Sequence, residues 1–137
     1  HAESEASQRL TAIPGLGIVT ATAMAATVTD PSQFRSGRQF AAWLGLTPQQ
    51  HSTGGKTQLG GISKQGDRYL RRLLVVGATA VIRHTKDKPT PMANWIRKLL
   101  EKKPFRLVSV ALANKLARIV WVVLTRKEAY RPYQLAA

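Results

Sequence analysis

The sequence predicts an all-α fold, a compact bundle of about five to six helices with an N-terminal helix-hairpin-helix-like element and a long Gly-rich loop. Apolar side chains recur at helical spacing in residues 67–84, 91–103 and 105–126. The hydrophobic content of 44% over 137 residues is ample for a packed core. Residues 45–66 instead hold six glycines and no sustained period, which indicates a loop that is irregular or holds at most a short hairpin.

Residues 3–12 and 18–28 are expected to form the first two helices, joined by the turn sequence Ile13-Pro14-Gly15-Leu16-Gly17. This arrangement within residues 1–30 is similar to a helix-hairpin-helix element, in which amides of the Gly-x-Gly turn hold a nucleic-acid backbone. Gly15 and Gly17 are therefore candidate phosphate contacts. The alternative is a helical hairpin that touches no nucleic acid, because the sequence around the turn carries more acidic than basic residues. Both interpretations stay open.

A further helix is expected to begin at Ser36-Gly37-Arg38-Gln39, because serine followed three residues later by glutamine is the capping-box pattern. Phe40, Trp43 and Leu44 then fall on one helical face, which we expect to be buried in the core.

Asp67 is expected to cap a helix that runs to about residue 84. On a helical wheel its apolar and basic residues separate, with Leu70, Leu73, Leu74, Gly77, Ala80 and Val81 on one side and Arg68, Arg71 and Arg72 on the other. Thr90-Pro91 marks the next helix start, with threonine as the cap and proline at the first position. The apolar spacing of residues 105–126 predicts the central helix. The tail segment Tyr130-Arg131-Pro132-Tyr133 is expected to be extended and to dock either on a partner or on the domain itself.

The charge balance predicts a polyanionic partner. Lysine and arginine number 21 against 7 acidic residues, which gives a formal net charge of +14 and an isoelectric point near 11.2. All but one of the basic residues follow residue 34, so the basic surface belongs to the Gly-rich loop and the helices after it. The absence of cysteine excludes disulfides and thiolate metal sites and fits a reducing cytoplasm. No apolar run approaches the roughly 18 residues of a membrane span, so no membrane is expected as a partner.

The candidate site is the Ser52-Thr53 pair inside the Gly-rich loop. The basic residues around it in the sequence are Lys56, Lys64, Arg68, Arg71 and Arg72. A hydroxyl nucleophile needs a phosphorus made electrophilic by positive charge, and the same cations bind phosphate. The pattern therefore predicts either attack on a phosphodiester or phosphate binding by a noncatalytic DNA- or RNA-binding module. His51 and His84 have no third ligand nearby, so no metal is expected in this chain.

Three stretches carry a resemblance to a known family. In chain order they are IPGLG, TDPSQFRSGRQFAAWLGLTP and HSTGGKTQLGGISKQGDRYLRRLL. They closely resemble the C-terminal domain of insertion-sequence 110 family transposases and the related pilin-gene invertases, and the resemblance covers nearly the whole chain. It implies a single transposase domain over residues 1–137, with an active-site loop at 45–66, a helical core at 67–126 and a tail at 127–137.

The resemblance also implies a longer recombinase. An RNase H-like domain N-terminal to this chain is expected to bind Mg²⁺, whereas this domain needs no cofactor and is expected to be inactive when isolated. The implied partners are DNA and a guide RNA that bridges donor and target DNA. The full protein is expected to be a homo-oligomer in the cytoplasm of a bacterium or archaeon.

The family's nucleophile is a serine in the loop after Gly45-Leu46-Thr47-Pro48, eleven residues ahead of the serine of a Ser-Lys-x-Gly motif. That motif reads Ser63-Lys64-Gln65-Gly66 here, so the spacing selects Ser52. The loop is one residue shorter than in some relatives, and an ungapped match selects Thr53. Ser52 is therefore the expected nucleophile and Thr53 the alternate, with the nearby lysines and arginines as phosphate clamps.

Overall fold

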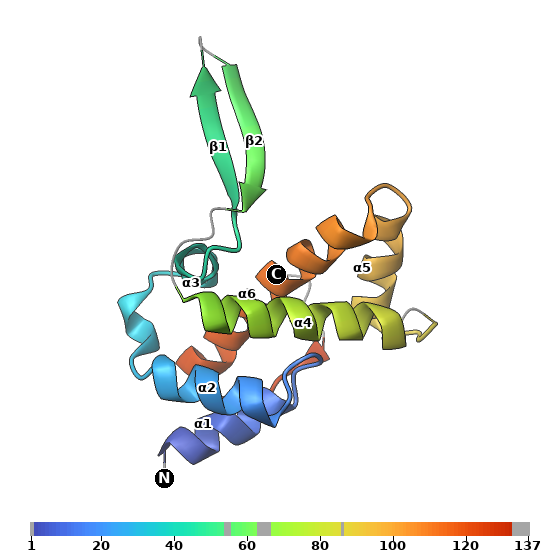
Figure 1. The fold of residues 1–137 in the computed structure, drawn as a ribbon. Coiled ribbons are helices and arrows are strands. Elements are labelled where there is room, and N and C mark those ends of the chain that lie inside the picture. Colours follow the sequence, from blue (N-terminus) through green and yellow to red (C-terminus); the bar gives the residue numbers. More distant parts are fainter. Residues whose placement is uncertain (1, 54–55, 63–66, 86, 133–137) are drawn as a thin grey trace.

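The computed structural model describes residues 2–53, 56–62, 67–85 and 87–132, and for the two strands it describes the backbone. Within these residues the α-helices are α1 (Ala2–Thr11), α2 (Ile18–Thr27), α3 (Gly37–Trp43), α4 (Arg68–Thr85), α5 (Pro91–Leu100) and α6 (Phe105–Arg126), with one 3-10 helix, η1 (Pro31–Gln33). Two strands, β1 (Pro48–Thr53) and β2 (Lys56–Ile62), form a hairpin that projects from the helices (Figure 1). The predicted helical bundle is confirmed.

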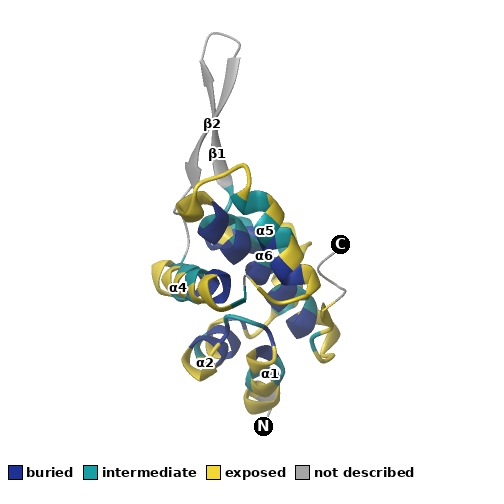
Figure 2. Ribbon diagram, turned by 90° about the vertical axis from the view of Figure 1, so that its right-hand side faces the viewer, coloured by how far each residue is buried: buried dark blue, intermediate teal, exposed yellow. Residues whose placement is uncertain are grey.

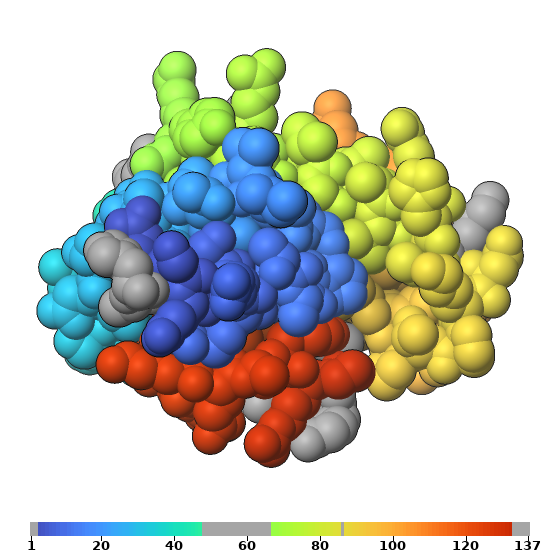
Figure 3. Space-filling view, turned by 90° about the horizontal axis from the view of Figure 1, so that it is seen from below, coloured from blue at the N-terminus to red at the C-terminus, as the bar shows by residue number. Residues whose placement is uncertain are grey.

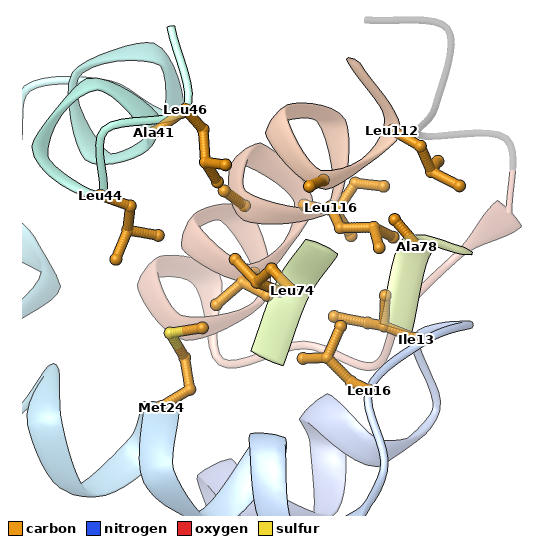
Figure 4. Packing of buried hydrophobic residues seen from close by; sticks show 14 of the residues in the cluster. Ile13, Leu16, Met24, Ala41, Leu44, Leu46, Leu74, Ala78, Leu112 and Leu116 are labelled. Carbon is orange, nitrogen blue, oxygen red and sulfur yellow. The ribbon is translucent and has the colours of Figure 1, made fainter. Parts of the chain in front are cut away.

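The long helix α6 lies at the centre, as predicted, and packs against α1, α3, α4 and α5. Leu112, Leu116 and Val120 of α6 are fully buried. Burying each such side chain stabilises the fold by about 1.5–3 kcal/mol. Figure 4 shows Leu112 and Leu116 in one cluster with Ala78 of α4 and Ile13 of the N-terminal turn. This core also explains the hydropathy of α6: the helix is long and apolar enough to cross a membrane, yet 56% of its apolar window is buried inside the fold.

The helix starts that the sequence predicts are confirmed by side-chain caps. In each case the side-chain oxygen of the capping residue accepts a hydrogen bond from the backbone amide three residues later. Ser36 accepts from Gln39 at 3.1 Å, Asp67 from Leu70 at 3.0 Å and Thr90 from Ala93 at 3.1 Å. Each bond satisfies an amide that has no partner within the helix, which is typically worth about 1 kcal/mol. Pro91 occupies the first helical position, where its missing amide proton costs nothing.

The turn between α1 and α2 packs directly on α4. The amide of Leu16 donates to the carbonyl of Ile13 at 3.1 Å, and Gly15 has a φ of +89°, as a type II turn requires after Pro14. A Cβ atom on Gly77 of α4 would lie 2.1 Å from the carbonyl oxygen of Gly15. The two backbones therefore meet at a point where only glycine fits on α4.

The buried side of α4 differs in part from the prediction. Ala80, which the helical wheel places among the core residues, is exposed. The buried residues of α4 are Leu70, Leu74, Ala78, Val81 and Ile82. The contact of Gly77 with the N-terminal turn and the packing of α4 on α6 set the rotation of the helix, and neither is visible in the periodicity of α4 alone.

Aromatic rings join η1 and α3 to the core. The ring of Phe34 lies 5.1 Å from that of Phe40 and 5.4 Å from that of Trp43, between centroids. Trp121 of α6 donates from Nε1 to the carbonyl of Pro31 at 3.0 Å. Phe40 is fully buried, as expected, but Trp43 is 39% exposed. The placement of Trp43 in the core is therefore wrong, because it ends α3 and covers the other two rings from outside.

The Gly-rich segment holds a hairpin of two antiparallel strands. Pro48 pairs with Ile62 and Gln50 with Leu59, so β2 contains one extra residue, as in a β-bulge. Within the described residues neither strand contacts a helix. The hairpin therefore stands clear of the bundle, and Figure 1 shows it projecting upward from the side of the bundle where α3 lies.

Candidate nucleic-acid interface

The hairpin rises from a fixed base at the end of α3. Gly45 has a φ of +80°, its amide donates to the carbonyl of Ala42 at 2.9 Å, and the amide of Leu46 donates to the carbonyl of Ala41 at 3.0 Å. This pair of bonds is the Schellman arrangement, with glycine at the left-handed position. Leu44 and Leu46 are buried on either side of Gly45. The chain therefore leaves the core toward β1 in a defined direction.

Side chains of two other helices bind the same base. Arg71 of α4 donates from Nη1 to the carbonyl of Leu44 at 3.3 Å. Asn114 of α6 donates from Nδ2 to the carbonyl of Leu46 at 3.1 Å. Arg71 is half-buried, which differs from the prediction of an outward-facing residue, because its guanidinium reaches the carbonyl of the residue that follows α3. The base of the hairpin is thus tied to α4 on one side and to α6 on the other.

Both candidate nucleophiles lie in β1, near the tip of the hairpin. Ser52 pairs with Thr57 and Thr53 pairs with Lys56. The backbone of Lys56 is therefore directly opposite Thr53 and diagonal to Ser52. Lys64, an expected phosphate clamp, lies outside the described residues. The chemical roles of these residues remain predictions.

The outward face of α4 is basic with apolar residues between the charges. Arg68 and Arg72 are exposed, as predicted. Tyr69 and Val76 lie among them and are 55% and 61% exposed. Figure 2 shows the exposed residues of α4 along its outer side and the buried ones toward the interior. A nucleic-acid backbone lying along this face would meet guanidinium groups and an aromatic ring together.

Sequence reasoning missed a second basic cluster, which the fold assembles from α3 and α6. Arg38 and Arg118 become neighbours because Gly37 sits against the backbone of Arg118. Burial lowers the pKa of Arg118, and the charge of Arg38 lowers it further. Burial likewise lowers the pKa of Lys115, with a smaller effect from Arg118. The Lys115 ammonium lies 4.9 Å from the ring centroid of Trp95. The three-residue spacing of Lys115 and Arg118 was the one signal in the sequence, and nothing there paired them with α3.

The two glycines of the N-terminal turn differ in their surroundings. Gly15 packs on α4, whereas a Cβ on Gly17 would meet no atom within 4 Å. The start of α2 is exposed there, and Ile18 and Val19 next to it are 77% and 63% exposed. Figure 3 shows α1 and α2 side by side on one face of the molecule, with α4 along one edge of that face. Phosphate binding by these glycines remains a prediction.

No group of three His, Asp or Glu side chains in the described part of the chain is placed to hold a metal ion. His84 is exposed near the end of α4. The cationic groups that this part of the chain offers to a phosphate are guanidinium and ammonium groups.

Comparisons with known proteins agree on one family. Residues 7–92 match the family described as Transposase IS116/IS110/IS902. A probable family 20 transposase of Pseudomonas aeruginosa is 55% identical over 91% of this chain and 37% of its own length. The transposase for insertion sequence element IS1111A of Coxiella burnetii is 47% identical over 93% of the chain and 35% of its own length. The transposase for IS1328 of Yersinia enterocolitica is 46% identical over 91% and 37%. The chain thus spans little more than a third of these relatives.

Proposed function

The chain belongs to the IS116/IS110/IS902 transposase family, and we propose that it is the DNA-binding catalytic part of a recombinase and supplies Ser52 as the nucleophile of strand exchange. The observation that carries the proposal is the fixed base of the hairpin. Ser52 lies on a strand that leaves the core between arginine-bearing helices, with Arg71 bound to the base itself. A hydroxyl delivered in this way reaches a phosphodiester that the adjacent cations hold in place.

The proposed step is a transesterification. The Oγ atom of Ser52 attacks the phosphorus of a DNA phosphodiester and loses its proton to solvent or to a base outside the described residues. The bond from phosphorus to one deoxyribose oxygen breaks, and that oxygen takes up a proton. The product is a phosphoserine ester to DNA, so the number of phosphate ester bonds is unchanged. A hydroxyl of another strand then reverses the reaction and rejoins the DNA.

Positive charge has two tasks in this step. It offsets the negative charge of the phosphate, and it stabilises the extra charge that develops on the phosphoryl oxygens as Oγ attacks. Lys56, opposite Thr53 in the hairpin, and Lys64 are the proposed clamps nearest the nucleophile in the sequence. Arg68 and Arg72 are proposed to hold the strand along α4, since an arginine fork matches two phosphate oxygens. From the family resemblance we propose Mg²⁺, guide RNA and further subunits as partners of the longer protein.

A covalent intermediate is the direct test of this function. Full-length protein incubated with end-labelled DNA of its own insertion element is expected to yield a labelled protein band that survives denaturation and disappears after protease digestion. If the protein binds and processes the DNA while no such band forms under any trapping condition, this chain is a noncatalytic binding module and the nucleophile lies elsewhere.

Arg68 and Arg72 are predicted to contribute to the salt dependence of DNA binding. The double variant Arg68→Ala/Arg72→Ala should reduce the slope of log affinity against log salt by about 0.9 for each phosphate that the protein no longer neutralises. Fluorescence anisotropy over a series of salt concentrations measures this slope. Lys102→Ala/Lys103→Ala is the matched control, with the same charge change at the exposed turn before α6, away from the hairpin (Figure 1). Equal slopes for the two double variants would show that α4 makes no specific phosphate contact.

A further inference from the structure

The junction of α3 and α6 brings two arginines together at close quarters. A Cβ atom on Gly37 would lie 3.1 Å from both the Cα and the carbonyl oxygen of Arg118, so the start of α3 rests on the backbone of α6. Arg38 follows Gly37 directly, and its charge acts on the Arg118 guanidinium. Backbone packing fixes the position of Gly37 on Arg118, and it therefore fixes where the side chain of Arg38 begins.

Among the described residues no acidic side chain forms an ion pair with Arg38 or Arg118. The neighbouring charges that act on this part of α6 are positive: Arg38 acts on Arg118, and Arg118 acts on Lys115. The Nε atom of Arg118 is buried and has no hydrogen-bond partner. Arg9 also has a buried Nε without a partner, but it lies on α1, whose first turn is acidic. A like charge beside the half-buried Arg118 guanidinium is costly unless an anion joins them.

A surface pocket lined by Arg38 extends to Thr47 at the base of the hairpin. Its volume is about 410 Å³, and it is lined by Arg35, Ser36, Arg38, Gln39, Ala42 and Thr47. Thr47 is the residue immediately before β1. The Ser36 hydroxyl oxygen and the Gln39 amide oxygen accept bonds from backbone amides at the start of α3. The charged donors of the pocket are the guanidinium groups of Arg35 and Arg38, and the hydroxyl and side-chain amide protons of its polar residues can add to them. The pocket therefore offers positive charge beside the strand that carries Ser52.

We propose that Arg38 and Arg118, with Arg35 at the pocket, bind a phosphate group of a nucleic-acid backbone on the α3 side of the hairpin base. The inference rests on the proposed nucleic-acid binding and adds a second phosphate-binding site to the one proposed on α4. With Arg68 and Arg72 on α4, the bound strand crosses the base of the hairpin and is held on both sides of it. A strand held at two points cannot slide past Ser52, which is what attack at a single phosphodiester requires.

A phosphodiester fits this site better than a carboxylate does. Arginine forks bind phosphate oxygens in pairs, and one phosphate accepts from two arginines at once. The negative charge of a bound phosphate would offset the repulsion between Arg38 and Arg118. Duplex DNA and guide RNA both present this group, so the chemistry of the site is shared and the two are separated by measurement.

The test uses full-length protein with labelled duplex DNA and, in a separate arm, a labelled RNA hairpin. Arg38→Ala/Arg118→Ala should weaken binding about tenfold and lower the salt slope by about one unit, with Lys102→Ala/Lys103→Ala as the control of equal charge. Loss of affinity for DNA alone assigns the site to DNA, and loss of affinity for RNA alone assigns it to RNA. Arg38→Ala by itself changes an exposed side chain and removes no buried contact of the core, and it should weaken binding of the same nucleic acid several-fold.

Two results would overturn the inference. The first is steeply salt-dependent binding by the wild type that weakens in Arg68→Ala/Arg72→Ala but not in Arg38→Ala or Arg38→Ala/Arg118→Ala. In that case the second phosphate-binding site does not exist, while the proposed function stands. If those variants leave both nucleic-acid arms unchanged but lower the melting temperature of the free full-length protein, the pair binds an acidic segment of the longer protein instead. Salt-insensitive binding by the wild type would instead contradict the proposed function itself.

Discussion

Full-length protein with Ser52→Ala is expected to form no covalent adduct with DNA, while its affinity for DNA falls by no more than about fivefold. The reason for the split is that one hydroxyl contributes about 1 kcal/mol to binding through a hydrogen bond, whereas nothing else at that position supplies the attacking oxygen. Adduct on a denaturing gel and affinity by anisotropy are measured on the same preparation. Because Ser52 lies on a strand that contacts no helix in the described structure, the substitution leaves the helical core intact.

Thr53→Ala is the matched control for this experiment, since it removes a hydroxyl from the neighbouring residue of the same strand. It should retain the adduct. If Thr53→Ala loses the adduct and Ser52→Ala keeps it, the one-residue difference in loop length was placed wrongly and Thr53 is the nucleophile. If both variants keep the adduct, the hairpin is a binding element and catalysis belongs to another part of the protein.

Gly77→Ala is expected to destabilise the protein by about 3 kcal/mol or more, or to prevent folding. The added Cβ would lie 2.1 Å from the carbonyl oxygen of Gly15, and a backbone atom cannot turn aside as a flexible side chain can. Either α4 or the turn between α1 and α2 must move, which disturbs the buried contacts of Ile13 and Leu16 (Figure 4). Chemical denaturation followed by circular dichroism measures the change.

The sign of this effect is informative because helix propensity predicts the opposite. In an open helix, alanine is more stable than glycine by about 1 kcal/mol. A Gly77→Ala protein that is more stable than wild type would therefore show that α4 and the turn do not touch. Gly17→Ala is the control: a Cβ there meets nothing within 4 Å and the backbone is not left-handed, so stability should change by less than about 1 kcal/mol.

Local features of the fold were predictable because their causes are local. Asp67 and Thr90 cap the helices that the sequence assigns to them, since a cap and its amide are three residues apart. The range of α6 follows from its apolar spacing for the same reason. The exposure of Ala80 and Trp43 was not predictable, because it depends on which other helix covers each position. Periodicity gives a helix two faces but does not determine how far each is covered.

In the candidate site, too, only the residues brought together by local sequence were predictable. Ser52 and the arginines of α4 were found from one continuous stretch of sequence, because the hairpin and α4 are adjacent along the chain. Arg38 and Arg118 are eighty residues apart and meet through a glycine contact between α3 and α6, which no spacing rule contains. Arg71 shows the converse: its place in the sequence suggested a phosphate clamp, and its guanidinium also serves the fold by binding the Leu44 carbonyl.

Locating the covalent link on the protein decides whether Ser52 forms the bond to DNA. The trapped adduct of the full-length wild-type protein is digested with nuclease and protease, and the peptide that retains a nucleotide is sequenced by mass spectrometry. We expect the nucleotide phosphate on Ser52, within the peptide that contains β1. A nucleotide on any residue outside the hairpin would contradict the assignment of this domain as the source of the nucleophile.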